Sequence, residues 1–185
     1  RHERHERHER HERHERHEKG TTMGQYEVVQ RLAAVATTYD VREKGKEDVA
    51  LTVRGAPMSL TPRFAIVDGS DKELASLEGN FNKTAFHVLD GERKEVASVT
   101  FPSIAFKKTL ALKVGSETYT ADAGVLALEY DFRCADAAGK VAIEVKKREG
   151  LTHVRDRFVV EAADGVPREV AVLVKIGRAS CRERV

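Results

Sequence analysis

The segment Val67-Asp-Gly-Ser-Asp-Lys-Glu-Leu-Ala-Ser76 recurs 22 residues later as Leu89-Asp-Gly-Glu-Arg-Lys-Glu-Val-Ala-Ser98. Each copy places an Asp-Gly pair between two stretches with strand character, which is the pattern of a β-hairpin. Glycine takes positive φ without a steric penalty, and aspartate accepts hydrogen bonds from the backbone of its own turn. The four residues from Gly69 to Lys72 indicate a loop longer than the tightest two-residue turn. The repeat therefore predicts consecutive antiparallel hairpins.

Period-two alternation extends this pattern along the body of the chain. Leu126, Leu128 and Phe132 share one face of a predicted strand, with Glu129 and Asp131 on the other. Twelve segments are predicted strands: 25–31, 37–42, 49–54, 62–67, 73–79, 83–89, 95–101, 107–113, 116–120, 125–133, 140–146 and 155–161. Their even spacing predicts an all-β antiparallel meander, and closure into a barrel would remove its exposed edges.

The run Glu169-Val-Ala-Val-Leu-Val-Lys175 follows Gly165 and Pro167 and is harder to assign. Its β-branched residues favour a thirteenth strand by local propensity. A short apolar run does not by itself distinguish a strand from a buried helix.

Both ends of the chain differ from this body. The first eighteen residues are six copies of Arg-His-Glu, and without apolar residues to anchor them we expect residues 1–22 to be low-complexity, disordered or artefactual. A histidine-rich metal tract is the alternative, and Met23 is the expected initiator. Ile176-Gly-Arg-Ala-Ser-Cys-Arg-Glu-Arg-Val185 is similar to a translated sequencing adapter. We therefore expect a fragment whose domain spans 23–176, with 177–185 as an adapter-derived tail.

The charge balance of the body argues against nucleic acid as a partner. The whole chain has a formal charge of +2, but the segment from Met23 to Lys175 has 22 basic and 23 acidic residues. No apolar run reaches the ~20 residues of a membrane-spanning helix, and a body with one cysteine forms no internal disulfide. We therefore expect a monomeric, cytoplasmic domain without a transmembrane segment.

Residues with catalytic or metal-binding potential are few and scattered. His87 lies in a predicted strand, His153 in a loop, and Cys134 at the end of a strand. None occurs in a nucleophile, phosphate-loop or paired-histidine motif. Asp68-Gly-Ser-Asp71 has oxygen ligands but lacks the rest of a calcium loop, so we interpret it as a turn. The expectation is a protein that is not an enzyme and has no metal or other cofactor.

Basic clusters are the best candidates for a binding site. They comprise Lys107, Lys108, Lys146, Lys147, Arg148, Arg155 and Arg157. Such a patch would attract phosphoinositides or other anionic headgroups, at about 1 kcal/mol per cation near a charged membrane. The alternative is an ordinary solvated strand surface that discourages edge pairing.

An ordered series of hairpins resembles the LURP-one-related family, which is similar in fold to tubby C-terminal domains and phospholipid scramblases. The series comprises Tyr39-Asp-Val-Arg42, Phe64-Ala-Ile-Val-Asp-Gly69, Gly139-Lys-Val-Ala-Ile-Glu-Val-Lys-Lys147 and Val154-Arg-Asp-Arg-Phe-Val-Val-Glu161. The resemblance covers Gln25 to Ile176. It implies a twelve-stranded barrel around a hydrophobic C-terminal helix that begins with Val170-Ala-Val-Leu-Val174. The chain departs from the family at Arg148-Glu149-Gly150, where members usually have an aromatic-serine pair.

Two functions follow from these observations. The first is a non-enzymatic barrel module that binds a ligand or partner not identified by the sequence. The alternative, implied by the resemblance to tubby-like domains, is peripheral binding to phosphoinositide or other anionic lipids. Because arginines in a barrel interior would be buried without partners, we also expect the chain to leave the barrel or fray after Ile176.

Overall fold

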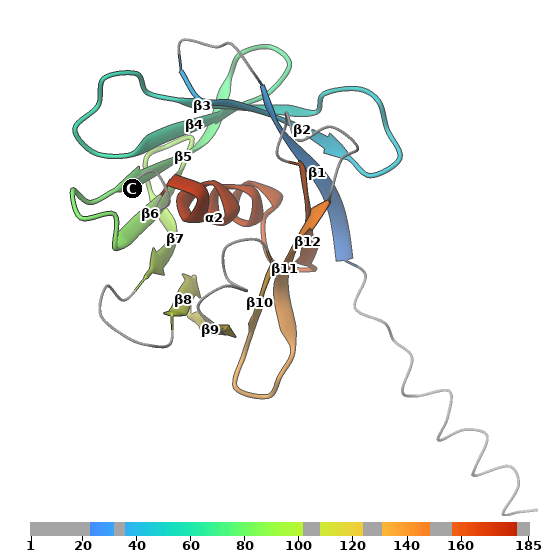
Figure 1. Ribbon diagram of the computed structural model, residues 1–185, viewed down its shortest axis with the longest axis vertical. Coiled ribbons are helices and arrows are strands. Elements are labelled where there is room, and N and C mark those ends of the chain that lie inside the picture. The colour runs from blue at the N-terminus through green and yellow to red at the C-terminus, as the bar shows by residue number, and fades with distance from the viewer. Residues whose placement is uncertain (1–22, 32–35, 102–107, 124–130, 149–156, 181–185) are drawn as a thin grey trace, which may run out of the picture.

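Twelve antiparallel strands pair in chain order and close into a barrel, because β1 pairs with β12 as well as with β2 (Figure 1). The computed structural model describes residues 23–31, 36–101, 108–123, 131–148 and 157–180. The strands are β1 (Met23–Arg31), β2 (Thr38–Glu43), β3 (Leu51–Gly55), β4 (Arg63–Val67), β5 (Glu73–Gly79), β6 (Ala85–Asp90), β7 (Glu95–Thr100), β8 (Lys108–Val114), β9 (Glu117–Ala123), β10 (Phe132–Ala135), β11 (Val141–Arg148) and β12 (Arg157–Ala163). One helix, α2 (Arg168–Ser180), follows them in the described part of the chain.

The predicted fold class and the number of strands are confirmed. The observed strands differ from the predicted ranges by a few residues at their ends, which is the usual uncertainty of element boundaries. The largest difference is in the tenth strand, predicted at 125–133 and observed from Phe132 to Ala135. Residues 125–130 of that prediction lie outside the described residues, as do the predictions for 1–22 and 181–185.

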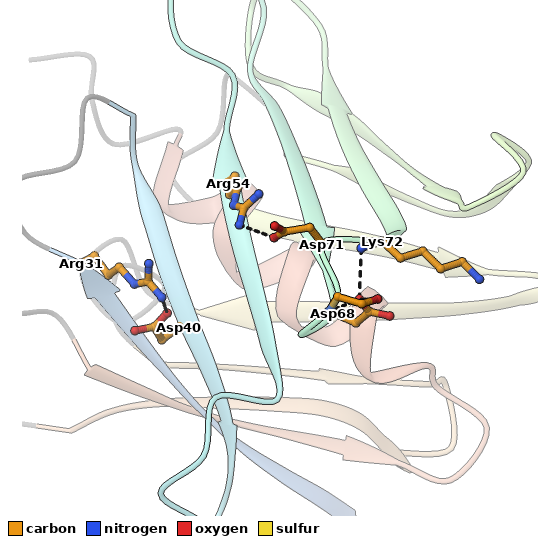
Figure 2. Close-up of polar contacts among 7 residues, drawn as sticks. Arg31, Asp40, Arg54, Asp68, Asp71 and Lys72 are labelled. Carbon is orange, nitrogen blue, oxygen red and sulfur yellow. Dashed lines mark hydrogen bonds and ion pairs between the residues drawn. The ribbon is translucent and has the colours of Figure 1, made fainter.

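Three turns at one end of the barrel share the same hydrogen-bond pattern. In each, an aspartate Oδ1 accepts from backbone N–H groups two and four residues later at 2.8–3.1 Å. The aspartates and their donors are Asp68 with Ser70 and Lys72, Asp90 with Glu92 and Lys94, and Asp136 with Ala138 and Lys140. Figure 2 shows the Asp68–Lys72 contact and, nearby, the ion pair between Arg54 and Asp71.

Each of these turns needs a left-handed residue in its fourth position. Asp71, Arg93 and Gly139 have φ values of 63°, 68° and 82° there, and a register shift lies beside each turn. The predicted Asp-Gly hairpins are therefore confirmed, and Asp136-Ala-Ala-Gly139 is a third copy with glycine moved to the left-handed position.

Helix α2 fills the barrel (Figure 1). Every residue from Val170 to Ile176 is buried, and these side chains pack against the inward-facing apolar side chains of the strands. The helix implied by the family resemblance is present, and the thirteenth strand favoured by local propensity is wrong. A closed barrel offers no free edge to an additional strand, so a segment inside it must satisfy its own backbone hydrogen bonds.

The expectation that the chain leaves the barrel after Ile176 is wrong for residues 177–180. Helix α2 continues to Ser180. The hydrogen side chain of Gly177 permits close packing, because a Cβ there would lie 3.2 Å from Leu77 Cδ2. Arg178 is half-buried rather than enclosed, and its guanidinium carbon lies 5.6 Å from the centre of the Phe101 ring. The helix thus brings this arginine to the end of the barrel, where the cost of burying a charge is reduced.

Truncation of a helix side chain tests this core. We expect Leu173→Ala to lower the free energy of unfolding by about 2–5 kcal/mol, because it leaves a cavity in the barrel. Leu60→Ala is the matched control: Leu173 is 0 % exposed and Leu60 is 87 % exposed. The control should change stability by no more than about 0.5 kcal/mol. Urea denaturation followed by circular dichroism measures both, and equal losses would contradict a core centred on α2.

Two glycines test the turn geometry. Gly139→Ala should lower the free energy of unfolding by about 1–2 kcal/mol, because an L side chain is strained at φ +82°. Gly69 lies in the equivalent hairpin without positive φ, and a Cβ there would meet nothing within 4 Å. Gly69→Ala should therefore be near neutral in the same denaturation assay. A larger loss at Gly69 than at Gly139 would show that the turn conformation is wrong.

Candidate functional site

The alternating direction of the strands divides the loops between two ends of the barrel. The three aspartate turns lie at one end, together with the start of α2; we call it the turn end. The loops that follow β3, β5 and β11 lie at the opposite end, where α2 finishes, and we call this the exit end. Gly177 establishes the direction of the helix, because it packs against Leu77 near the end of β5 and Phe86 near the start of β6.

The described basic candidates occur at the exit end. Lys146, Lys147 and Arg148 are the last residues of β11, and Arg157 is the first residue of β12. Arg148 and Arg157 are direct cross-strand partners. Lys108 begins β8 at the same end, but β9 and β10 separate it from β11. Lys107 and Arg155 lie outside the described residues. The topology thus gathers four candidates on one hairpin and places Lys108 apart from them.

The exposed cations of this hairpin have weak acidic partners on the outer surface. Lys146 Nζ lies 3.2 Å from Glu144 Oε2, and Arg157 Nη1 lies 3.7 Å from Glu27 Oε1. Surface pairs of this kind contribute about 0–1 kcal/mol, so a stronger anion can displace them. Lys147 differs: it is half-buried, and its backbone N–H donates to Asp131 Oδ1 at 2.6 Å. Among the described residues of the hairpin, Lys146, Arg148 and Arg157 are therefore the accessible cations.

The exit end also carries exposed apolar side chains that sequence analysis missed. Met58 is 101 % exposed, Leu60 87 % and Phe81 71 %. They belong to the loops 56–62 and 80–84, which we call the apolar loops. The loops are adjacent at their bases, because the Gly79 N–H donates to the Pro62 carbonyl at 2.8 Å. Neither loop contains an acidic residue. In the sequence, the first loop is marked by an apolar pair between two prolines, and the second by a single phenylalanine between two asparagines. Neither pattern is periodic.

The turn end has a different electrostatic character. Asp68, Asp90 and Asp136 are held there by their turns. The Ser70 hydroxyl, with the backbone N–H groups of Ser70 and Lys72, lowers the pKa of Asp68 and keeps it ionised at neutral pH. Fixed carboxylates therefore mark the turn end, whereas the apolar loops of the exit end have none.

Of the remaining sequence candidates, His153 lies outside the described residues, and His87, Cys134 and Asp68 are accounted for by local structure. His87 is exposed on β6, with its Nδ1 2.8 Å from Glu95 Oε2. Cys134 is buried in β10, and desolvation raises the pKa of its thiol to about 12. Within the described residues no group of three His, Cys, Asp or Glu side chains is arranged to hold a metal ion. Asp68 belongs to a turn, as predicted.

Lys175 is another residue that sequence analysis missed. It is 2 % exposed within the barrel, and its Nζ lies 3.5 Å from the centre of the Phe158 ring. A desolvated ammonium over an aromatic face gains about 2 kcal/mol, which offsets part of the cost of burying the charge. The signal in the sequence is a single lysine at the end of an otherwise apolar helical segment.

Comparisons with known proteins identify the family. The model of the LURP-one-related family matches residues 25–176. The chain belongs to the LURP-one-related family. No curated protein is significantly similar to it in sequence. The X-ray structure of a protein from Arabidopsis thaliana superposes with a TM-score of 0.58 at 14 % identity, over 86 % of this chain and 93 % of that one. At this identity the likeness shows the fold alone.

The described residues contain no helix with the length and hydropathy needed to span a membrane.

Alkylation tests whether Cys134 is a buried, unreactive cysteine. In a Cys181→Ser variant, iodoacetamide at about pH 8 should leave Cys134 unmodified in the native protein, because only about one thiol in 10⁴ is ionised at a pKa of about 12. Urea should make Cys134 react fully, as measured by intact-mass spectrometry. Rapid alkylation of the native protein would instead show an accessible, activated cysteine.

Proposed function

We propose that this LURP-one-related barrel is a non-enzymatic binding module that attaches peripherally to anionic membranes through its exit end. The observation that carries the proposal is the β11–β12 hairpin, which presents Lys146, Arg148 and Arg157 together at that end. Lys108 adds a further basic position on the same end of the barrel. The ligand chemistry is that of phosphorylated headgroups, including phosphoinositides.

The filled interior supports an external binding site. Residues from Val170 to Ile176 occupy the space that an empty barrel would offer to a small apolar ligand. Binding of such a ligand inside would require displacement of α2 and exposure of its apolar surface, at about 25 cal/mol per Å². The outer surface and the two ends therefore remain as the places where a partner contacts the barrel without disrupting its core.

The magnitude of the electrostatic attraction is sufficient for reversible attachment. Each cation near an anionic surface contributes about 1 kcal/mol, so Lys146, Arg148 and Arg157 together give about 3 kcal/mol. This corresponds to roughly a hundredfold enrichment at the surface. The attraction acts within a Debye length of about 8 Å at physiological salt, so it operates when the exit end faces the membrane. The cytoplasmic leaflet, where anionic lipids are concentrated, is the expected location.

Vesicle co-sedimentation tests the proposal. The unmodified chain should sediment with vesicles that contain phosphatidylserine or a phosphoinositide, and not with pure phosphatidylcholine. The double variant Lys146→Glu/Arg148→Glu should reduce binding by at least about tenfold, because it reverses two exposed charges at the exit end. We leave Lys147 unchanged, since it is half-buried and its reversal would disturb the fold.

The matched control is Lys94→Glu/Lys140→Glu, which makes the same change in net charge at the turn end. Both control lysines are exposed. Binding should fall far less in this variant than in the exit-end variant. An equal fall in both would show that only net charge matters, and binding that ignores lipid charge would rule out the proposed site.

A further inference from the structure

The apolar loops indicate how the exit end meets its partner. We infer that Met58, Leu60 and Phe81 insert into the lipid bilayer when the barrel binds an anionic membrane. This inference rests on the proposed function and extends it from headgroup attraction to insertion, which defines the orientation of the barrel. Among the described residues, three of the four large apolar side chains that are strongly exposed lie in these loops.

Local hydrogen bonds hold the backbone of both loops in place. The Ala56 N–H donates to the Arg63 carbonyl at 2.8 Å and closes the first loop, while Pro57 and Pro62 restrict its backbone. In the second loop, the Asn80 side-chain oxygen accepts from the Thr84 and Ala85 N–H groups at 2.8 and 3.2 Å. Insertion would therefore require little ordering of either loop, so less of the gain from burial is lost to entropy.

The backbone at the tip of the first loop is itself unusual. Met58 has a φ of 60°, in the left-handed region that non-glycine residues seldom adopt. The side chain there is fully exposed and gains no packing within the barrel. Residues held in such conformations are concentrated at binding sites. The turn at residues 57–58 therefore holds the Met58 side chain outside the barrel.

The charges around the loops favour a bilayer over a protein surface. The loops contain no acidic residue, and the second contains the half-buried Lys83. At their bases the exposed Arg63 lies directly across from Glu78 of β5. Ser59 separates Met58 from Leu60 in the first loop, and Phe81 lies between Asn80 and Asn82 in the second. The apolar side chains are therefore separated along the chain by polar residues. An anionic bilayer has charged headgroups at its surface and apolar acyl chains beneath them. Apolar side chains that reach the acyl chains and cations that stay at the headgroups would both contribute to binding. A stable protein interface generally requires a continuous packed core.

The chain provides a convenient spectroscopic test because it contains no tryptophan. Phe81→Trp introduces a single reporter in the second apolar loop. Its emission should shift to shorter wavelength on addition of phosphatidylserine vesicles, and lipids brominated on their acyl chains should quench it. Val49→Trp is the matched control, because Val49 is an exposed apolar residue between β2 and β3, at the turn end. Its emission should not change.

A second variant separates insertion from headgroup attraction. Met58→Ser/Leu60→Ser/Phe81→Ser should keep its circular dichroism spectrum and bind vesicles at least about tenfold more weakly, since three exposed apolar groups are removed. The residual binding should be lost at high salt.

The outcomes of these experiments distinguish the two proposals. If the Phe81→Trp variant sediments with anionic vesicles but its emission does not shift, insertion is overturned and headgroup binding stays intact. Vesicle binding by the triple serine variant at the unmodified level also overturns insertion and favours a protein partner for the apolar loops. Failure of the unmodified chain to bind any anionic vesicle overturns both proposals.

Discussion

The structure depends on a constraint imposed by barrel closure: whatever fills the interior must satisfy its own backbone hydrogen bonds. Every strand has a partner on each side, so the wall has no free edge for a further strand. Helix α2 meets this requirement and places a continuous buried segment inside the wall. Its valines cost at most about 0.7 kcal/mol each in helix propensity, whereas their burial contributes about 1.5 kcal/mol or more each. Burial therefore decides the conformation against local preference.

This balance explains which parts of the fold were predictable. Strand number followed from period-two alternation, because each strand has one face toward α2 and one toward solvent. The Asp-Gly hairpins followed from turn chemistry, which acts within five residues and needs no tertiary context. The conformation of Val170 to Val174 did not follow from its residues, since it depends on closure by strands more than a hundred residues earlier. Only the family resemblance implied the helix. The expected departure from the barrel after Ile176 was wrong for a related reason. It rested on the charge of the arginines, without the packing of Gly177 against Leu77 and the contact of Arg178 with Phe101.

Prediction of the candidate site was limited by topology. In an antiparallel meander, the end at which a loop lies depends on the parity of all preceding strands. The start of β8, the end of β11 and the start of β12 lie at the same end of the barrel because successive strands alternate in direction. If one strand between β8 and β11 had been overlooked in the sequence, their basic residues would have been assigned to opposite ends. The apolar loops were missed because their residues carry no periodicity, and exposure becomes visible only when the strands on either side are located. Lys175 ends an apolar run, and the sequence was interpreted from the apolar residues of that run. The contact of Lys175 with Phe158 joins the helix to the barrel wall, and no local sequence pattern predicts it.

The same constraint directs where function can reside in this fold. The interior is occupied by α2, so substitutions there disturb stability. The outer wall consists of strands whose register is set by their backbone pairing. The loops at the ends are different, since their backbone hydrogen bonds close locally at the base, as between Ala56 and Arg63 or Asn80 and Ala85. They tolerate apolar or charged tips without consequence for the core. The two ends differ in the residues of their loops. The turn end has aspartates that stabilise its turns, and the exit end exposes Met58, Leu60 and Phe81 to solvent. Under the proposed membrane attachment, the exposed apolar side chains and the cations of the β11–β12 hairpin would both face the bilayer, because both lie at the exit end.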